Sequence, residues 1–404
     1  MRVTPLSAWT RLISTVIAAA SVAIASGAER AQVRVSNPDA SVARPGEVIV
    51  IPFAEIRKHI PDAHMYHLDV RDTDGARVAA QATNFNPDDR RALYDDLVFQ
   101  HDFAAGEEVA VFSIQTTDTP VPPAPMLVSA RHIPERLDDF AWENDRVGHR
   151  IYGPALMTAA AGGSRMISSG IDVWCKRVRY PIVDRWYTKG HDAYHVDTGE
   201  GLDLYSVGTT RGCGGTGVWE GDRLWVSRNW ENQRVLANGP IRAIFEIGYE
   251  TWQAGPRWIM ETKRFTVDAG RNLDQIESTF TVQKDGDVVI AIGIGKPSDA
   301  RVDKITRDER SGILSVWQTY EKTGVSVGCG IVLSPDADFV GFVDDAQNYL
   351  ILARARSGVL LRYHAGSGWT GGGDFPDVAS WENYLQGFAA RLRAPVRVTL
   401  SAMP

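Results

Sequence analysis

Four residues near the middle of the chain could move a proton or hold an anion: His195, Tyr194, Glu200 and Arg211. Because imidazole titrates near neutral pH, His195 is the leading candidate for a general base or acid. Tyr194 or a protonated Glu200 could deliver a proton, and the planar guanidinium of Arg211 could hold a carboxylate. The alternative for His195 is a hydrogen-bonded histidine at the edge of a sheet.

A second set of residues combines flat aromatic faces with charged and amide groups, which suits a polar, ring-shaped and acidic ligand such as a sugar acid. Trp142 could stack on a sugar ring, while Glu143 and Arg150 could bind hydroxyl or carboxylate groups. The same spacing is also typical of a salt-bridged strand and turn at a domain junction. The predicted binding residues are Trp142, Glu143, Asn144, Arg146, Arg150, Trp174, Lys176, Asn229 and Arg242.

Two other kinds of site are disfavoured by the spacing. The glycine-rich stretch 211–217 lacks the Lys-Ser/Thr ending of a phosphate-binding loop, so it is expected to line a cleft or to form a turn. His191 and His195 with Asp197 could hold a metal, but their spacing matches no specific metal motif. We therefore predict no metal and no cofactor.

The N-terminus has the pattern of a secretory signal in residues 1–28, with two arginines, a short apolar segment and small residues at its end. The formal charge of the whole chain is −7, and removal of Arg2 and Arg11 makes it −9. An acidic protein is a poor partner for nucleic acid or an anionic membrane. We expect a periplasmic or secreted protein that binds an acidic oligosaccharide, with neither nucleic acid nor membrane as a partner after signal cleavage. Three cysteines allow one disulfide, whose pairing the spacing does not determine.

The elements that must position these residues are mainly strands. A proline cluster at 120–125 predicts a boundary between an N-terminal β-sandwich at 29–125 and a larger domain at 126–404. In 276–283, apolar and polar residues alternate, with Glu277, Thr279 and Thr281 on the polar face, and 245–250 alternates in the same way. The fold class is therefore all-β with antiparallel sheets, and 381–392 is the clearest helix.

Several motifs together resemble the family known as domain of unknown function 4861 (DUF4861). The motifs are Trp142-Glu143-Asn144, Tyr152-Gly153-Pro154, Asp172-Val173-Trp174, Tyr194-His195 with 199–203, 211–215, and Asn238-Gly239-Pro240-Ile241-Arg242. This resemblance covers most of the chain beyond the signal. It implies an exported accessory of polysaccharide breakdown whose large domain is similar to the galactose-mutarotase-like supersandwich.

One activity implied by the resemblance is a dehydratase, a hydro-lyase that removes water across C4 and C5 of a terminal uronic acid in fragments of ulvan-type polysaccharide. Such an elimination needs a cation at the carboxylate, a base for the C5 proton and an acid for the departing oxygen. Arg211 with Lys176 or Arg242 would hold the carboxylate. A chain-cleaving polysaccharide lyase, a glycoside hydrolase and a non-catalytic carbohydrate-binding protein remain alternatives.

Overall fold

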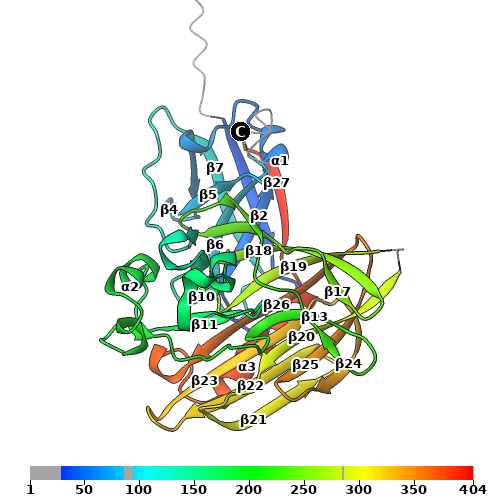
Figure 1. Ribbon diagram of the computed structural model, residues 1–404. Helices are drawn as coiled ribbons and strands as arrows, with labels where there is room; N and C mark the ends of the chain where they lie inside the picture. Colours follow the sequence, from blue (N-terminus) through cyan, green and yellow to red (C-terminus); the bar gives the residue numbers. More distant parts are fainter. Residues whose placement is uncertain (1–28, 86–93, 284–285, 404) are drawn as a thin grey trace, which may run out of the picture.

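The computed structural model describes residues 29–85, 94–283 and 286–403. The predicted signal, residues 1–28, lies outside this part of the chain. The described residues form antiparallel sheets with few helices, so the predicted all-β class is confirmed (Figure 1). Within these ranges, no helix has both the length and the apolar character needed to cross a membrane.

The N-terminal sandwich consists of two sheets that enclose their own apolar core. One sheet has the order β27-β1-β7-β3-β4 and the other the order β2-β6-β5. The strands are β1 (Arg30–Ser36), β2 (Arg44–Pro52), β3 (Leu68–Arg71), β4 (Arg77–Val78), β5 (Ala80–Thr83), β6 (Asp96–Phe103), β7 (Val109–Thr116) and β27 (Arg397–Ala402). A short helix, α1 (Phe53–Arg57), follows β2.

The C-terminal strand β27 belongs to this sandwich. It pairs antiparallel with β1 from Ala31 opposite Ala402 to Ser36 opposite Arg397. Val396, Val398 and Leu400 pack against the N-terminal core. The first and last strands of the described residues therefore meet in one sheet, where the red strand runs beside the blue strands in Figure 1. The division at residue 125 stays a prediction about domain boundaries.

The rest of the chain forms one nine-stranded sheet and two five-stranded sheets. The nine-stranded sheet contains β15 (Asn232–Ala237), β16 (Arg242–Gly248), β17 (Trp252–Ala254), β18 (Arg257–Asp268), β19 (Leu273–Val282), β21 (Arg301–Asp308), β22 (Ile313–Tyr320), β23 (Val325–Leu333) and β26 (Leu360–Trp369). One five-stranded sheet contains β13 (Cys213–Trp219), β14 (Leu224–Trp225), β20 (Asp287–Gly295), β24 (Asp338–Asp344) and β25 (Asn348–Arg356). The other contains β8 (Ser129–Ile133), β9 (Asp139–Glu143), β10 (Val147–Ile151), β11 (Asp172–Lys176) and β12 (Gly201–Leu202).

The main core lies on one face of the nine-stranded sheet. Alternate residues of β16 and β18, such as Phe245 and Phe265, meet apolar residues from both five-stranded sheets there, including Ile292 and Phe140. This arrangement is expected of strands with one buried face. The other face of the same sheet carries the polar residues that alternate with these apolar ones. The elements that pack on this polar face therefore decide where a site can form.

Part of that second face is covered by α3 (Val378–Arg393), which contains the predicted helix 381–392. Trp381 and Leu385 of α3 pack with Trp317 and Val332 of the sheet. Asp377 begins the helix, since its side chain accepts a hydrogen bond from the Ser380 backbone N–H and the Ser380 hydroxyl is bonded back to the Asp377 backbone. The remaining helical turns are α2 (Val183–Lys189), η1 (Met65–His67), η2 (Pro134–Arg136), η3 (Pro154–Met157), η4 (Ala159–Ser164), η5 (Ala193–His195) and η6 (Thr370–Gly372).

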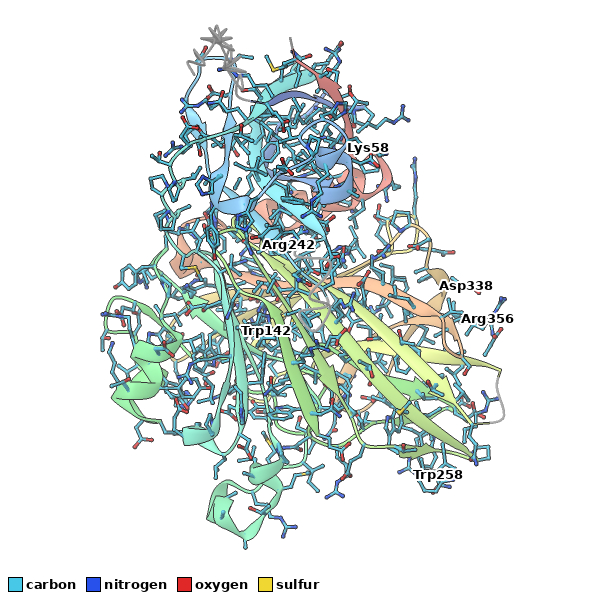
Figure 2. All side chains as sticks on the ribbon, turned by 90° about the horizontal axis from the view of Figure 1, so that it is seen from above. Lys58, Trp142, Arg242, Trp258, Asp338 and Arg356 are labelled. Carbon is cyan, nitrogen blue, oxygen red and sulfur yellow. The ribbon has the colours of Figure 1, made fainter. Side chains whose placement is uncertain are left out.

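Two glutamines of the N-terminal sandwich bind the backbone of the nine-stranded sheet at its edge. The side-chain oxygen of Gln81 accepts hydrogen bonds from the backbone N–H groups of Ile241 and Arg242, and its amide nitrogen donates to the Arg242 carbonyl at 2.8 Å. Gln100 donates to the Ala269 carbonyl at 2.7 Å. Arg242 therefore lies at the junction of the sandwich and the large sheet (Figure 2).

Candidate functional site

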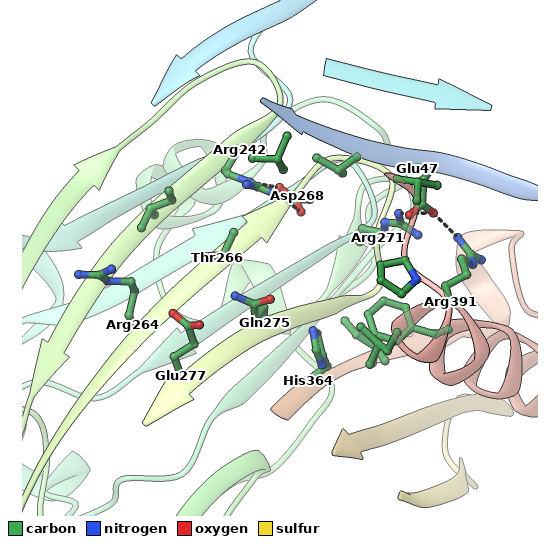
Figure 3. Close-up of a pocket in the computed structure, with 18 of the residues that line it drawn as sticks. Glu47, Arg242, Arg264, Thr266, Asp268, Arg271, Gln275, Glu277, His364 and Arg391 are labelled. Carbon is green, nitrogen blue, oxygen red and sulfur yellow. Dashed lines mark hydrogen bonds and ion pairs between the residues drawn. The ribbon is translucent and has the colours of Figure 1, made fainter. Parts of the chain in front are cut away.

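A cavity of about 560 Å³ lies between the N-terminal sandwich and the polar face of the nine-stranded sheet (Figure 3). This volume is within the range of small-molecule sites in proteins. Strands β16, β18, β19 and β26 line one side, and β2, β27 and the end of α3 line the other. Its polar and charged lining residues are Glu47, Arg242, Arg264, Thr266, Asp268, Arg271, Gln275, Glu277, His364 and Arg391.

Cross-strand pairing arranges the sheet side of the cavity in rows. In one row, Thr266 is opposite Gln275, and Gln275 is opposite His364. In the next, Arg264 is opposite Glu277. Directly opposite residues in neighbouring strands present their side chains on the same face. Four strands thus supply one continuous polar surface from residues that are far apart in the sequence.

Two arginines of the cavity have carboxylate partners of their own. Arg242 binds both oxygens of Asp268, with Nε at 2.6 Å from Oδ1 and Nη2 at 2.9 Å from Oδ2. Arg264 binds Glu246 with Nε at 3.0 Å and Nη2 at 2.6 Å from the same oxygen. Such paired guanidinium contacts hold both side chains in defined positions. Burial is the largest influence on the pKa of Arg242 and lowers it, but the Asp268 charge leaves this pKa above its usual range.

A different charge balance exists where β2 approaches α3. Arg271 and Arg391 both lie near Glu47, with N–O distances of 3.3 Å and 3.9 Å. Burial lowers the pKa of Arg391, and the neighbouring charges of Arg271 and Arg44 lower it further. Arg44 is 1% exposed, and among the described residues its Nε and Nη1 atoms have no hydrogen-bond partner. Two buried arginines therefore share a single carboxylate, with the charge of Arg44 nearby.

His364 is a buried histidine that lines the cavity from β26. It is 4% exposed, its ring packs edge-on against Phe388, and its Nδ1 has no hydrogen-bond partner among the described residues. Burial lowers the pKa of His364 to about 3, and the Arg362 charge lowers it in the same direction. The imidazole is therefore neutral at neutral pH, and one of its ring nitrogens is buried without a partner among the described residues.

The predicted residues Arg150, Tyr194 and His195 lie in another part of the molecule. Arg150 donates to Asp172 at 2.5 Å and to Asp203 at 2.9 Å, and it also donates to the Tyr194 hydroxyl at 3.2 Å. Tyr194 is 2% exposed, and burial raises its pKa. Residues 193–195 form a 3-10 turn instead of the strand considered for them. His195 remains accessible, and its Nδ1 lies 2.9 Å from the Asp203 carbonyl.

The proposed role of Glu200 as a protonated acid needs correction. Lys189, Arg185 and Tyr180 all donate hydrogen bonds to its carboxylate. These donors, with Lys189 the strongest influence, lower the pKa of Glu200 to about 2. The side chain is therefore an ionised acceptor at neutral pH and has no proton to deliver.

Glu143 and Lys176 form a buried ion pair. Each side chain is 1% exposed, and Lys176 Nζ lies 2.6 Å from Glu143 Oε2. The Glu143 carboxylate also accepts the backbone N–H groups of Ile182 and Val183, where α2 begins. Asn144 donates to the carbonyls of Asp268 and Arg271. The polar groups of these three side chains therefore have hydrogen-bond partners within the protein. This agrees with the alternative from sequence, in which the segment is a salt-bridged strand and turn.

Trp142 and Trp174, the two tryptophans among the predicted binding residues, have no free face. Trp142 is 1% exposed, packs against Phe245 and Phe265, and donates its indole N–H to Asp274 at 2.7 Å. Trp174 is fully buried and packs against Trp186. Both rings serve the core in this structure, since the strands that carry them are buried on both faces.

Arg211, Asn229 and Arg146 have three further environments. Arg211 is 1% exposed and donates to the Ser169 hydroxyl and the Thr216 carbonyl, and burial lowers its pKa to about 10. Asn229 donates to the Gly153 carbonyl in the interior. Arg146 is partly exposed and pairs with Asp374 at 2.7 Å. The glycines after Arg211 allow close packing: Gly212 has φ 59°, and a Cβ there would lie 2.0 Å from the Ile171 carbonyl oxygen.

The structure therefore gives His195, Arg211 and Arg242 different neighbours, and of the predicted residues only Arg242 lines the described cavity. The catalytic and binding roles inferred from sequence stay predictions. Sequence reasoning missed Arg271, Arg391 and Glu47. It noted the segment 363–369, which contains His364, as a weak candidate for the rim of a saccharide cleft, but it gave His364 no catalytic or binding role. The alternation of apolar and polar residues in the strands did indicate a polar sheet face, and Glu277 was placed on it. The alternation does not show which other part of the chain covers this face.

Two alternatives raised by the sequence concern other chemistry. Cys175, Cys213 and Cys329 are all buried, and none of them is in a disulfide. Across the described ranges, no group of three or more His, Cys, Asp or Glu side chains could hold a metal ion, and this includes His191, His195 and Asp197.

Comparison with known proteins gives three findings. The family model described as "Domain of unknown function (DUF4861)" matches residues 35–398. The protein named "Uncharacterized protein P7" from Formosa agariphila is 30% identical over 343 residues, which cover 81% of this chain and 83% of that protein. Among solved structures, a protein in the glycosyl hydrolase family 38 from Enterococcus faecalis aligns with a TM-score of 0.46 and 10% identity. That alignment covers 92% of this chain but only 47% of the solved chain, so the present chain spans about half its length.

Proposed function

The chain belongs to the family described as "Domain of unknown function (DUF4861)", and we propose that it is a carbohydrate-active enzyme of the lyase type that acts on acidic oligosaccharides. The family resemblance inferred from the motifs is thereby confirmed. The finer activity in this proposal is a hydro-lyase that removes water across C4 and C5 of a terminal uronic acid. In line with the predicted signal, we propose that the protein acts in the periplasm or outside the cell.

The observation that supports this proposal most is the cavity that combines arginines with a buried, neutral histidine. Arg242, Arg264, Arg271 and Arg391 line it, and all four carry permanent positive charge that attracts a sugar acid. His364 lines the same surface, and its Nδ1 is buried without a partner among the described residues. A hydroxylated and negatively charged ring would suit the charged and polar groups of this surface better than a non-polar ligand.

The elimination places separate demands on these side chains. A guanidinium beside the uronate carboxylate makes the C5 proton more acidic, because it stabilises the negative charge that develops on the carboxylate in the transition state. Neutral His364 accepts the C5 proton, and an adjacent bound carboxylate raises the pKa of its imidazole, which favours the transfer. The C5–H electron pair forms the C4–C5 double bond as the C4–O bond breaks, and the proton that His364 took from C5 passes to the departing hydroxyl to give water. We therefore move the proposed base from His195 to His364.

The test is to incubate the purified protein with oligosaccharides that end in a uronic acid, and with neutral oligosaccharides as a control. Ultraviolet absorbance reports the conjugated double bond, and mass spectrometry reports the product. Absorbance with loss of one water and no shortening supports the proposal. Absorbance with shortening indicates a chain-cleaving lyase, shortening without absorbance indicates a glycoside hydrolase, and binding alone indicates a carbohydrate-binding protein.

The location of the base is tested by matched substitutions of the two histidines. We expect His364→Gln to lower kcat at least about 100-fold, the usual contribution of a positioned base. His195→Gln should leave kcat within about threefold, because His195 is an accessible residue that does not line the cavity. The opposite result would return the base to His195. Circular dichroism of both variants shows whether the fold is intact.

A further inference from the structure

We propose that Arg271 and Arg391 form an oxyanion subsite that recognises a carboxylate or a sulfate ester on a sugar. These two residues are called the arginine subsite below. This inference rests on the proposed function for the identity of the ligand as a saccharide. The inference specifies which end of the cavity binds the charged group of the ligand. It also implies that the N-terminal sandwich takes part in recognising the ligand.

The first argument is the charge balance of the arginine subsite. Arg271 and Arg391 share one acid, Glu47, at 3.3 Å and 3.9 Å. Their side chains are only 11% and 13% exposed, so water screens them poorly. The charge of Arg44 also acts on Arg391. Besides Glu47, Arg391 has the Pro45 carbonyl as an acceptor at 3.3 Å, but that carbonyl carries no charge. An incoming oxyanion would supply the second negative charge that the two arginines lack.

The second argument is the contrast with the other arginines of the cavity. Arg242 already has both oxygens of Asp268, and Arg264 has Glu246. Each of these guanidinium groups is matched by one carboxylate, so neither needs a ligand charge. Figure 3 shows Arg271 and Arg391 with Glu47 at the α3 side of the cavity, separate from the Arg242 and Asp268 pair.

The third argument is the position of the subsite relative to His364. Phe388 packs against the His364 ring with their centroids 5.0 Å apart, and Arg391 follows Phe388 by three residues on α3. Residues three apart lie on the same face of a helix. One helix face therefore brings a cation and an apolar contact to the same end of the cavity as the histidine.

Glu47 acts in this proposal as an internal competitor for the arginines. It occupies them in the free protein and keeps two buried cations from repelling each other. A ligand oxyanion must share or replace this contact. Since Glu47 lies on β2, the N-terminal sandwich contributes directly to the affinity of the site.

Calorimetric titration of the full chain with D-glucuronate, glucose 6-sulfate and glucose tests the subsite. Binding of either charged sugar with no detectable binding of glucose supports it, and the charged sugar that binds identifies the oxyanion. We expect Arg391→Gln to weaken that binding at least about tenfold, and Arg391→Lys to weaken it less, because lysine keeps the charge without the planar fork. The exposed Arg356→Gln serves as the matched control without effect.

Glu47→Gln gives a readout that misfolding cannot imitate. Removing the competing charge should tighten charged-sugar binding by about threefold or more, and added salt should weaken it. Equal affinities in wild type, Arg391→Gln and Glu47→Gln would overturn the proposal. Titration of His364→Gln separates the two ideas: charged sugars should still bind when turnover is lost or was never present.

Discussion

Glu143→Gln separates a structural role of the buried ion pair from a role in binding substrate. The substitution preserves the shape of the side chain and an oxygen that can accept the N–H groups of Ile182 and Val183. It removes the negative charge that faces Lys176 at 2.6 Å and replaces one of the two acceptor oxygens with an NH2 group. The lysine must then either stay charged in the interior or release its proton.

The size of the effect follows from these two options. Burial already lowers the pKa of Lys176 from 10.5. Neutralising a lysine at pH 7 instead costs about 5 kcal/mol, from roughly 3.5 pH units at ~1.36 kcal/mol each. Breaking a buried pair by removing one partner typically costs about 3–5 kcal/mol. We therefore expect Glu143→Gln to lower the free energy of unfolding by about 3–5 kcal/mol at pH 7.

The assay is urea unfolding followed by tryptophan fluorescence at pH 7 and pH 9. If Lys176 is neutral in the folded variant and charged in the unfolded chain, the unfolded chain binds more protons, so stability rises with pH. At pH 9 the upper limit falls to about 2 kcal/mol, from roughly 1.5 units. Exposed Glu250→Gln should stay within about 0.5 kcal/mol of wild type. A loss below about 1 kcal/mol at pH 7, together with a raised KM, would refute the structural interpretation.

Three further substitutions test other parts of the structure. Trp142→Phe removes the indole donor to buried Asp274 and should lower the free energy of unfolding by about 1–3 kcal/mol, measured by thermal unfolding. The affinity for saccharide, measured by titration, should not change. A lost affinity at full stability would support the predicted stacking role of Trp142. Glu200→Gln should be less stable than wild type at pH 7. Because the folded pKa of Glu200 is depressed to about 2, this difference in stability should disappear as the pH falls from about 4.5 towards 2. A stability difference that persists in acid would contradict the ionised state of Glu200. Gly239→Ala should displace Gln81, whose amide carbon lies 2.3 Å from the added Cβ, and should therefore speed hydrogen exchange at the backbone of Ile241 and Arg242. The matched control is Gly387→Ala, where the added Cβ lies in open space inside α3. This control should raise the free energy of unfolding by about 0.5–1 kcal/mol.

The strands and the main helix could be predicted because their patterns are local. The alternation in 276–283 corresponds to β19, where the even-numbered residues Ile276, Ser278, Phe280 and Val282 are buried. The helical spacing in 381–392 corresponds to α3. Each prediction needs only the period of apolar residues, which neighbouring positions in the sequence already contain.

The burial of the charged motifs could not be predicted in the same way. Sequence alone predicts exposed positions for residues such as Glu143 and Lys176, because lysine and glutamate are almost never buried without a partner. Their partnership crosses 33 positions in the sequence, through the pairing of β9, β10 and β11. The same holds for Arg150, whose partners Asp172 and Asp203 lie on other segments. A dense mixture of charges can therefore mark a network that fixes irregular loops in place as well as a ligand site.

The cavity itself depends on contacts between the two ends of the chain. Its sheet side comes from β16 to β26, but Glu47 lies on β2, while Val396 and Val398 belong to the C-terminal segment that packs against the N-terminal core. The opposite side therefore forms only when β27 pairs with β1 and the sandwich docks through Gln81 and Gln100. A polar sheet face becomes a site here because a second body covers it. For this reason, residues near both termini should affect ligand binding as strongly as residues in the motifs of the middle segment.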